Sequence, residues 1–300
     1  MATELTWIAN VPVSVLHACE AVALERPIAH AQLADLLRPG AAALVQRLKA
    51  IDLDAELFFR TAIPLAYHEP GERRLVETTL RRVEGNKGRD DVLSEIAAAL
   101  AQCRQVIIKA QPTLLDELAL RSGPLREQWE ARGPGLLAGI ARRTDANLIV
   151  DSATVFMVQP ICGGAGHAHL TNNSVRIEAV LANPFADLPE IVRLGWLIST
   201  LQGDLPQYNE SLRPEHRSLL PALAMIPPTL ETAADVELVG DSPQVLESTL
   251  ERWTTLGDQC ASFAATLAQW WRIYRDLRPP WPTALAALEQ LVVENQLRRE

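Results

Sequence analysis

The spacing of apolar residues changes once along this chain, and that change constrains the fold more than any other feature. Apolar residues recur at intervals of three and four positions through most of the 300 residues, as expected of helices. Between about 147 and 182 the interval falls to two, as expected of β-strands. A short stretch of sheet within a long helical chain predicts an α+β protein that is predominantly helical.

Two strands with different patterns are predicted in this stretch. Residues 153–158 are apolar at consecutive positions, which is typical of an interior strand covered on both faces. Residues 174–181 alternate instead, with apolar residues such as Val175 on one face and charged residues such as Arg176 on the other. That alternation predicts a half-exposed or edge strand. The glycine-rich segment 161–169 is then expected to be a loop between the two strands.

Helices are predicted on both sides of the strands. From about 11 to 145 the pattern is helical, and Pro39-Gly40, Gly123-Pro124 and Gly133-Pro134 are expected to interrupt it. The sequence therefore divides into a helical region, 1–145, and a region of a small sheet plus helices, 146–300. The two regions can also form one continuous domain.

Two helices after the strands have recognisable starts. Asp187 can cap the first of them, Pro189 fits its first turn, and Glu190 can reach back to complete a capping box. The second is predicted to begin at Asp241-Ser242-Pro243 and to run almost to Pro279 as one amphipathic helix. At 1.5 Å per residue it would be roughly 50 Å long.

Composition excludes several classes of protein. The net charge of −9 argues against nucleic acid as a partner, because a phosphate backbone is held mainly by clustered Lys and Arg. No uninterrupted apolar run approaches the length of a membrane span. The first residues fail as a signal peptide, because Glu4 precedes the apolar run and no basic residue occurs before Arg26. Four cysteines without a C-x-x-C pair favour reduced thiols, so we expect a soluble cytoplasmic protein.

The glycine-rich segment carries the candidate metal ligands. Residues two apart on an extended chain project to the same side, so His167 and His169 could bind one divalent metal ion. Glu178 on the following strand would be the third ligand. This set predicts a metal-dependent hydrolase. The alternative, which the sequence favours because two ligands alone do not define a site, is a pair of solvated loop histidines.

The same segment carries residues that suit two other kinds of chemistry. Cys162 could be a thiol nucleophile with a neighbouring histidine as its base, but an apolar strand end lacks the positive charge that lowers a thiol pKa. The glycines of 163–166 could also bind a phosphate group. Phosphate-binding loops lead from a strand into a helix, whereas this segment leads into another strand and has no lysine nearby.

The order of predicted elements over about 134–203 resembles the core of zincin-type metallopeptidases. A helix (GPGLLAGIARRT), a strand (TVFMVQP), a loop, an alternating strand (NSVRIEAVL) and a capped helix (DLPEIVRLGWLIS) follow one another. The resemblance implies that the alternating strand is the sheet edge that lines a substrate cleft. In that family the next helix carries the zinc-binding H-E-x-x-H, but here it reads P-E-I-V-R-L-G-W-L-I. No zinc ligand or catalytic residue is carried over, and a degenerate relative that has lost peptide hydrolysis and kept a cleft is implied.

No complete set of catalytic residues emerges from the sequence. We therefore expect a non-catalytic intracellular protein that acts through a protein- or peptide-binding surface, without a bound cofactor. The alternative is the metal-dependent hydrolase that would use His167, His169 and Glu178.

Overall fold

The computed structural model describes residues 3–69, 71–84, 90–240 and 244–297. The strands are β1 Glu4–Ala9, β2 Ser152–Val158, β3 Gly166–His169 and β4 Ser174–Glu178. The helices before β2 are α1 Val11–Ala23, α2 Ala31–Lys49, α3 Ala55–Leu65, α4 Glu72–Glu84, α5 Asp90–Ala110 and α6 Leu114–Arg143. Those after the sheet are α7 Glu190–Ser199, α8 Pro206–Asn209, α9 Leu220–Ala224, α10 Ile226–Asp235, α11 Gln244–Trp253, α12 Cys260–Leu277 and α13 Trp281–Leu297.

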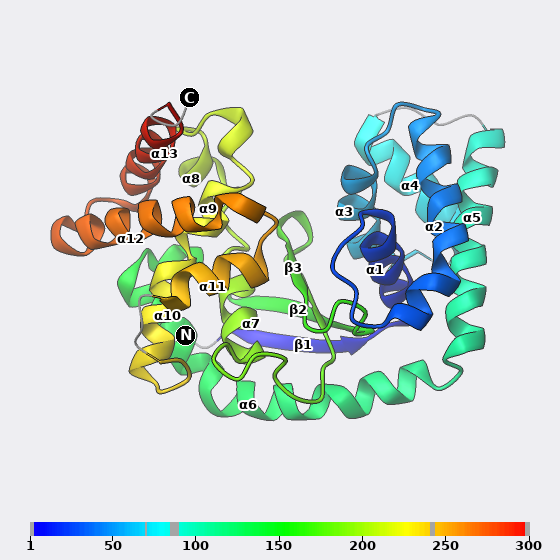
Figure 1. Ribbon diagram of the computed structural model, residues 1–300, viewed down its shortest axis with the longest axis horizontal. Coiled ribbons are helices and arrows are strands. Elements are labelled where there is room, and N and C mark those ends of the chain that lie inside the picture. Colours follow the sequence, from blue (N-terminus) through cyan, green and yellow to red (C-terminus); the bar gives the residue numbers. More distant parts are fainter. Residues whose placement is uncertain (1–2, 70, 85–89, 241–243, 298–300) are drawn as a thin grey trace.

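A small sheet lies between two groups of helices (Figure 1). Its strand order is β1-β2-β4-β3, in which β1, β2 and β4 are parallel and β3 is antiparallel to β4. Helices α1 to α5 gather at the end to which the parallel strands point, α8 to α13 gather at the other end, and α6 runs the length of the sheet (Figure 1). The prediction of a predominantly helical α+β protein is confirmed.

The sheet extends beyond the stretch that the sequence indicated, because β1 was missed. Residues 4–9 pair in parallel with β2 from the register Glu4 with Ser152 onward. The strand is short, and its apolar residues run directly into those of α1, so an alternation of six residues is hidden within a longer apolar stretch. Asn10 separates the two elements, since its side chain accepts a hydrogen bond from Val13 N at 2.9 Å and caps α1. The first 145 residues therefore contribute both a strand and helices.

The prediction that residues 174–181 form a half-exposed or edge strand is wrong. Strand β4 lies between β2 and β3, and each of its five residues is buried. Its polar face is covered by α1, where His17 and Glu20 meet the charged side chains of the strand. An alternating pattern indicates exposure only when the polar face meets solvent, and here that face meets other buried polar groups.

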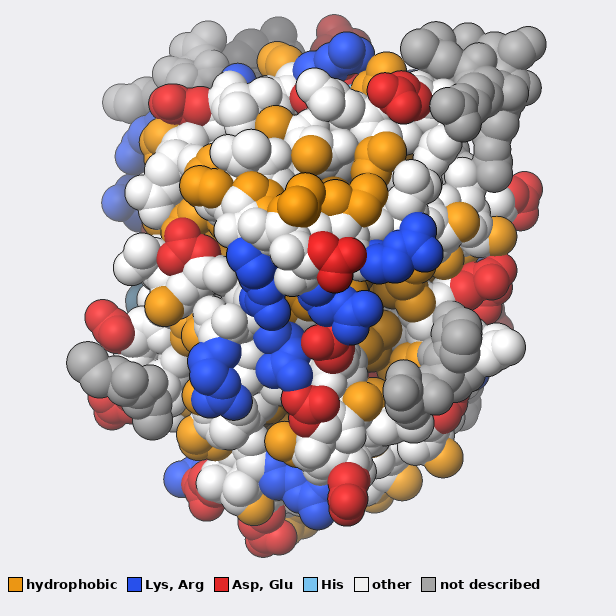
Figure 2. Space-filling view, turned by 90° about the vertical axis from the view of Figure 1, so that its left-hand side faces the viewer, with side chains coloured by type: hydrophobic (Ala, Val, Ile, Leu, Met, Phe, Trp, Pro, Cys, Tyr) orange, Lys and Arg blue, Asp and Glu red, His pale blue; other side chains and the backbone are white. Residues whose placement is uncertain are grey.

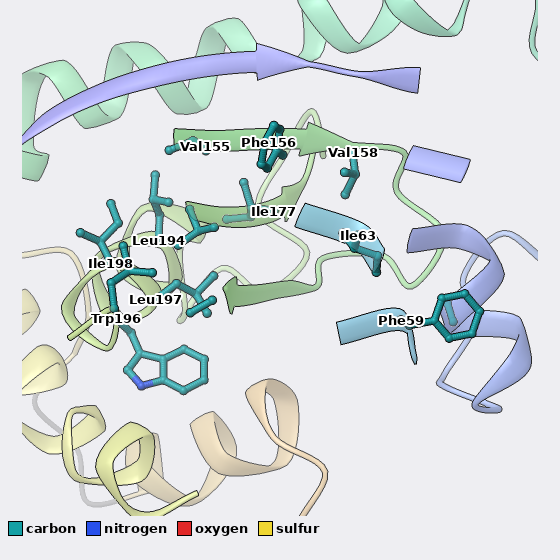
Figure 3. Packing of buried hydrophobic residues seen from close by; sticks show 14 of the residues in the cluster. Phe59, Ile63, Val155, Phe156, Val158, Ile177, Leu194, Trp196, Leu197 and Ile198 are labelled. Atoms are coloured by element: carbon teal, nitrogen blue, oxygen red, sulfur yellow. The ribbon is translucent and has the colours of Figure 1, made fainter. Parts of the chain in front are cut away.

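The core is built on both faces of the sheet. Helix α7 packs on β3 and β4, α6 packs on β1 and β2, and α1 covers the opposite face of β2. Figure 3 shows the side chains of Leu194, Leu197 and Ile198 extending from α7 on the side of β4, where Ile177 points toward them. In the same view Ile63 of α3 lies on the side of the α1 to α5 group. Both faces of the two central strands are therefore inside the protein.

Proline-containing dipeptides do not end the helices in which they occur. Helix α2 continues through Pro39, and α6 continues through Pro124 and Pro134, so the predicted interruptions are wrong. The glycine beside Pro39 serves close packing: a Cβ added at Gly40 would lie 2.6 Å from Cys103 Sγ on α5. At this position glycine permits contact between neighbouring helices and does not mark a stop.

The predicted 50 Å amphipathic helix is two helices. Helix α11 ends at Trp253 and α12 begins at Cys260, with a 3-10 turn, Gly257–Gln259, between them. Gly257 adopts φ +55, a left-handed conformation that a continuous helix does not permit. The predicted start at 241–243 lies outside the described residues. Trp270 on α12 is buried, as expected of a core position.

The surface at the end formed by the C-terminal helices carries charges of both signs. Figure 2 shows basic side chains interspersed with acidic ones across the middle of this face, below a band of apolar side chains. Ion pairs link the helices: Arg143 of α6 pairs with Glu231 and Asp235 of α10, and Arg275 of α12 also pairs with Glu231. Among the described helices, none has the length and apolar character required to span a membrane.

Candidate functional site

The glycine-rich segment contains a strand that the sequence did not predict. After β2 the chain turns through Gly163 at φ +80 and Gly164 at φ +110, and then forms β3 against β4. Both glycines occupy left-handed conformations that side chains disfavour. His167 and His169 therefore lie on a strand, and the expectation of two solvated loop histidines is wrong, since His169 is buried.

A buried carboxylate holds this segment in place. Glu178 Oε1 accepts hydrogen bonds from the backbone N–H of Ile161 at 2.9 Å and of Cys162 at 2.7 Å. Its Oε2 accepts from Gly164 N at 2.6 Å. His17 Nε2 lies 2.9 Å from Oε1 and donates to it, because an ionised carboxylate only accepts. The glycine-rich loop thus encloses an anion that belongs to the protein itself.

These hydrogen bonds determine the ionisation of Glu178. Burial alone would raise the pKa of this carboxyl, but the hydrogen bond from His17, the proximity of that ring and the backbone donors lower the pKa to about 2. Glu178 is therefore a carboxylate at neutral pH. The backbone amides that a phosphate group would need are directed at this carboxylate, so the exclusion of a phosphate site agrees with the geometry.

A second buried pair lies beside the first. Arg176 of β4 donates to the carboxylate of Glu20 on α1, and both side chains are buried. Arg176 faces His167 across the β3–β4 ladder, and Ser174 faces His169. Residues opposite each other in a ladder project to the same side of the sheet, so all four lie on the face that α1 covers.

The two histidines are adjacent and uncharged at neutral pH. Their ring centroids are 5.1 Å apart. Burial lowers the pKa of both imidazoles, and the positive charge of Arg176 lowers each pKa further. Neutral imidazole is the form that binds metals, but the same guanidinium repels a cation placed between the rings.

The structure does not bring the predicted metal ligands into one metal-binding group. Glu178 directs its two oxygens to His17 and to the loop amides rather than to His167 and His169. Over the described part of the chain, no three His, Cys, Asp or Glu side chains are grouped so that they could hold an ion. A divalent metal on His167, His169 and Glu178 stays a prediction.

Glu190 has a different position from the one that the sequence suggested. The predicted capping box is wrong: the N–H of Glu190 donates to Asn183 Oδ1 at 3.1 Å, and Asp187 pairs instead with Arg252. The Glu190 side chain is buried, and neither of its oxygens has a hydrogen-bond partner among the described residues. The asparagine caps the helix, which leaves Glu190 free to turn inward.

Glu190 and Arg193 meet the glycine loop from α7. Arg193 Nη1 donates to Gly164 O, and Arg193 Nη2 lies 3.6 Å from Glu190 Oε1. Burial raises the pKa of Glu190 to about 7; Arg193 opposes this shift and the charge of Glu178 adds to it. Two carboxyl groups with widely separated pKa values therefore flank the same loop.

Cys162 lacks the properties of a nucleophile. Burial and the neighbouring Glu178 carboxylate raise the pKa of its thiol to about 12. A thiol nucleophile needs the opposite shift, because the thiolate is the reactive form.

Three of the buried polar residues were missed in the sequence. His17 and Glu20 interrupt an otherwise apolar helix, and Arg193 interrupts the apolar run of α7. A charged residue inside a helix that is apolar nearly all round is the signal that could have found them, since such a residue must be paired when buried.

Comparison with protein-family models, with characterised proteins and with solved structures finds no match for this chain. The strand that the zincin resemblance assigned to the sheet edge lies in the interior, and the edge position belongs to β3. The resemblance itself stays a prediction.

Proposed function

We propose that this chain is a non-catalytic binding protein whose binding surface is the outer edge of β3. An extended segment of a partner protein would add to that edge as a further strand, held mainly by main-chain hydrogen bonds. The observation that carries the proposal is the position of β3 as the outer strand of the sheet, with one side of its backbone facing away from β4.

The register identifies the backbone groups that face outward. Glu178 N donates to Ala165 O at 2.8 Å across the β3–β4 pair. Because inward and outward groups alternate along an antiparallel strand, the N–H and C=O groups of His167 and His169 face β4. Those of Gly166 and Ala168 point away from it. A partner strand would bond first to the groups of Gly166, which is partly exposed, and would have to displace the cover over Ala168, which is 8 % exposed, to reach the other two.

Strand β3 is better suited to this role than the other edge of the sheet. Natural edge strands are blunted by charged residues or proline, and β1 carries an exposed glutamate, Glu4. Strand β3 contains neither a charged residue nor proline. The position of β3 is fixed by the loop that precedes it. Glu178 accepts a hydrogen bond from Gly164 N in that loop, and Arg193 donates to Gly164 O. A fixed edge loses little conformational entropy when a partner binds.

The burial of the acid and base groups favours a binding role over catalysis. Glu178, Glu190 and Arg193 are each 2 % exposed or less, and His169 is 3 % exposed. A general acid or base must come within hydrogen-bond reach of the substrate. These groups instead contact the loop and strands that they support, so we interpret them as structural.

Binding to this edge can be tested with Ala168→Pro. Proline removes the outward N–H and places its ring there, and edge strands tolerate proline at such a position. Peptides would first be selected from a displayed library of random linear sequences against the wild-type protein. We expect Ala168→Pro to weaken binding of a selected peptide at least about tenfold, since a main-chain hydrogen bond and the approach of the strand are both lost.

The matched control is Ala168→Ser, which keeps the N–H and nearly the same volume and should bind as the wild type does. Circular dichroism would establish that both variants are folded. Equal affinity of wild type and a folded Ala168→Pro variant would refute the proposed surface.

We further place the protein in the cytoplasm with protein or peptide partners. All four cysteines are free thiols, which supports a reducing compartment.

The metal-dependent hydrolase is the second candidate, favoured by the adjacent, uncharged rings of His167 and His169. Elemental analysis of protein purified without a His tag is its test. Stoichiometric zinc or manganese that is lost in His169→Ala would support the hydrolase over the binding role.

A further inference from the structure

The buried carboxyl of Glu190 lies beside the glycine loop without a hydrogen bond to it. A Cβ added at Gly164 would lie 3.3 Å from Glu190 Oε1, so the carboxyl and the backbone of the loop are neighbours. Glu190 is buried, and neither carboxyl oxygen has a hydrogen-bond partner among the described residues. Because buried polar atoms are nearly always hydrogen-bonded, two unpartnered oxygens on one carboxyl require an explanation.

Arg193 connects this carboxyl to the strand edge. Its Nη1 donates to Gly164 O, and its Nη2 forms an ion pair with Glu190 Oε1 at 3.6 Å. Its stem packs on the start of β3, since a Cβ added at Gly166 would lie 3.6 Å from Arg193 Cδ. The guanidinium also lies 5.7 Å from the ring centroid of Trp253 on α11. One side chain therefore contacts both the carboxyl and the loop that positions β3.

Two charged groups act on Glu190, and their effects are opposite. Arg193 of the same helix lowers the pKa of Glu190 and Glu178 of β4 raises it, while burial has the largest effect and raises the pKa to about 7. His17 of α1 contacts Glu178 on another side of the loop. Cys162 in the loop is an uncharged thiol at neutral pH, because its pKa is raised to about 12.

The other elements around α7 carry ion pairs that do not shift the pKa of Glu190. These pairs are Arg143 of α6 with Glu231 and Asp235 of α10, and Arg252 of α11 with Asp187 in the connection before α7. The histidines of β3 lie on the face of the sheet that α1 covers, away from α7. The ionisation of Glu190 is therefore governed by burial, by Arg193 and by Glu178.

We propose that Glu190 is a proton switch that regulates the edge of β3, an inference that rests on the proposed function of that edge. In the protonated state Arg193 donates to Gly164 O and anchors the loop. In the ionised state a carboxylate stands beside the guanidinium, and a charge-assisted hydrogen bond to a carboxylate is stronger than one to a neutral carbonyl. Arg193 then turns to Glu190 and releases Gly164 O, so the start of β3 loses its anchor.

The switch favours partner binding at the lower pH. Folding raises the pKa of Glu190, so the anchored state is the one that holds the proton, and the carboxyl changes from mainly protonated to mainly ionised between pH 6 and 8. An edge without its anchor loses more conformational entropy when a partner strand binds. We expect a selected peptide to bind at least about threefold more weakly at pH 8 than at pH 6.

Nuclear magnetic resonance of the full chain tests the switch without a partner. The carboxyl carbon of Glu190, labelled with ¹³C and assigned by its absence in Glu190→Gln, should titrate near neutral pH. The amide order parameters of Gly164 and Gly166 should be lower at pH 8 than at pH 6, because the loop has lost a hydrogen bond.

Two variants identify the origin of the change. Glu190→Gln keeps the neutral state at every pH, so its order parameters and its peptide affinity should be the same at pH 6 and 8. A change that came from His17 would persist in this variant. Glu127→Gln, at an exposed position on α6, is the matched control and should respond to pH as the wild type does.

Three results would overturn the switch. They are a Glu190 carboxyl that does not titrate between pH 6 and 8, equal order parameters at the two pH values in the wild type, and the same fall in a folded Glu190→Gln variant. Equal peptide affinity at pH 6 and 8 would refute the regulation while the proposed binding surface stands. Undiminished binding by Ala168→Pro would refute the surface, whereas the pH-dependent order of the loop would stand.

Discussion

Replacing Glu178 with glutamine removes the charge that holds the glycine loop while keeping the size of the side chain. The three donors at Oε1 fix that atom as oxygen, so the new NH2 group must face Gly164 N. One charge-assisted hydrogen bond of about 1.5–3 kcal/mol is lost, and two donors are left facing each other at a further cost of about 1–3 kcal/mol. We expect the free energy of unfolding to fall by about 2.5–6 kcal/mol.

The lowered pKa of Glu178 reflects the same hydrogen bonds and agrees with this magnitude. Its pKa is lowered from an ordinary value of 4.5 to about 2. At 1.36 kcal/mol per pKa unit, this lowering corresponds to a few kcal/mol of stability. Because the pKa is lowered by folding, this stability is present above pH 4.5 and is lost as the pH falls through about 2.

Urea unfolding at pH 7, followed by tryptophan fluorescence and circular dichroism together, measures the change. The midpoint should fall while the slope stays constant, and the difference between wild type and Glu178→Gln should shrink between pH 4.5 and 2. Glu127→Gln, at an exposed position, should stay within about 0.5 kcal/mol of wild type. A loss below about 1 kcal/mol in Glu178→Gln would show that the carboxylate does not anchor the loop.

Three other perturbations test the same site. Folding raises the pKa of Glu190 to about 7. The protonated side chain therefore stabilises the protein below pH 4.5, and this contribution is lost as the pH rises through 7. In urea unfolding, Glu190→Gln should be more stable than wild type at pH 8 and equal to it near pH 4.5. The difference between variant and wild type is the quantity to measure, because buried His167 titrates with the opposite sign, and a pH-independent difference would contradict the assignment. Gly164→Ala should lower stability by about 1–3 kcal/mol, since φ is +110 and the added Cβ would lie 2.5 Å from Pro184 Cγ, whereas Gly135→Ala on α6 meets nothing within 4 Å and should raise stability by up to about 1 kcal/mol. Because the thiol pKa of Cys162 is raised to about 12, iodoacetamide at pH 7 should modify Cys162 no faster in the native protein than in unfolded protein; faster native labelling would revive a thiol nucleophile.

Local patterns predict correctly those elements whose burial does not depend on which other residues pack against them. Strand β2 and helix α7 are apolar on nearly all sides, and a segment of that kind has to be buried wherever it lies. Strand β4 shows the limit of this reasoning. Its alternation predicts exposure, but α1, which is about 160 positions away in the sequence, supplies partners for its polar face.

The sequence predicts which segments form the candidate site but not which side chains pair within it. The sequence identified His167, His169 and Glu178, and all three lie on neighbouring strands. The position of His17 in an apolar helix indicates that its side chain is buried, but nothing in the sequence indicates that its partner is Glu178. Tertiary packing decides which buried polar groups pair with each other. A single sequence does not specify those contacts.

Amide hydrogen exchange resolved by residue, with and without a bound library-selected peptide, is the decisive measurement for a partner strand on β3. Slower exchange at Gly166 and Ala168 in the complex, with β1 unaffected, is the expected outcome. A complex in which those two amides exchange as fast as in the free protein would place the partner elsewhere.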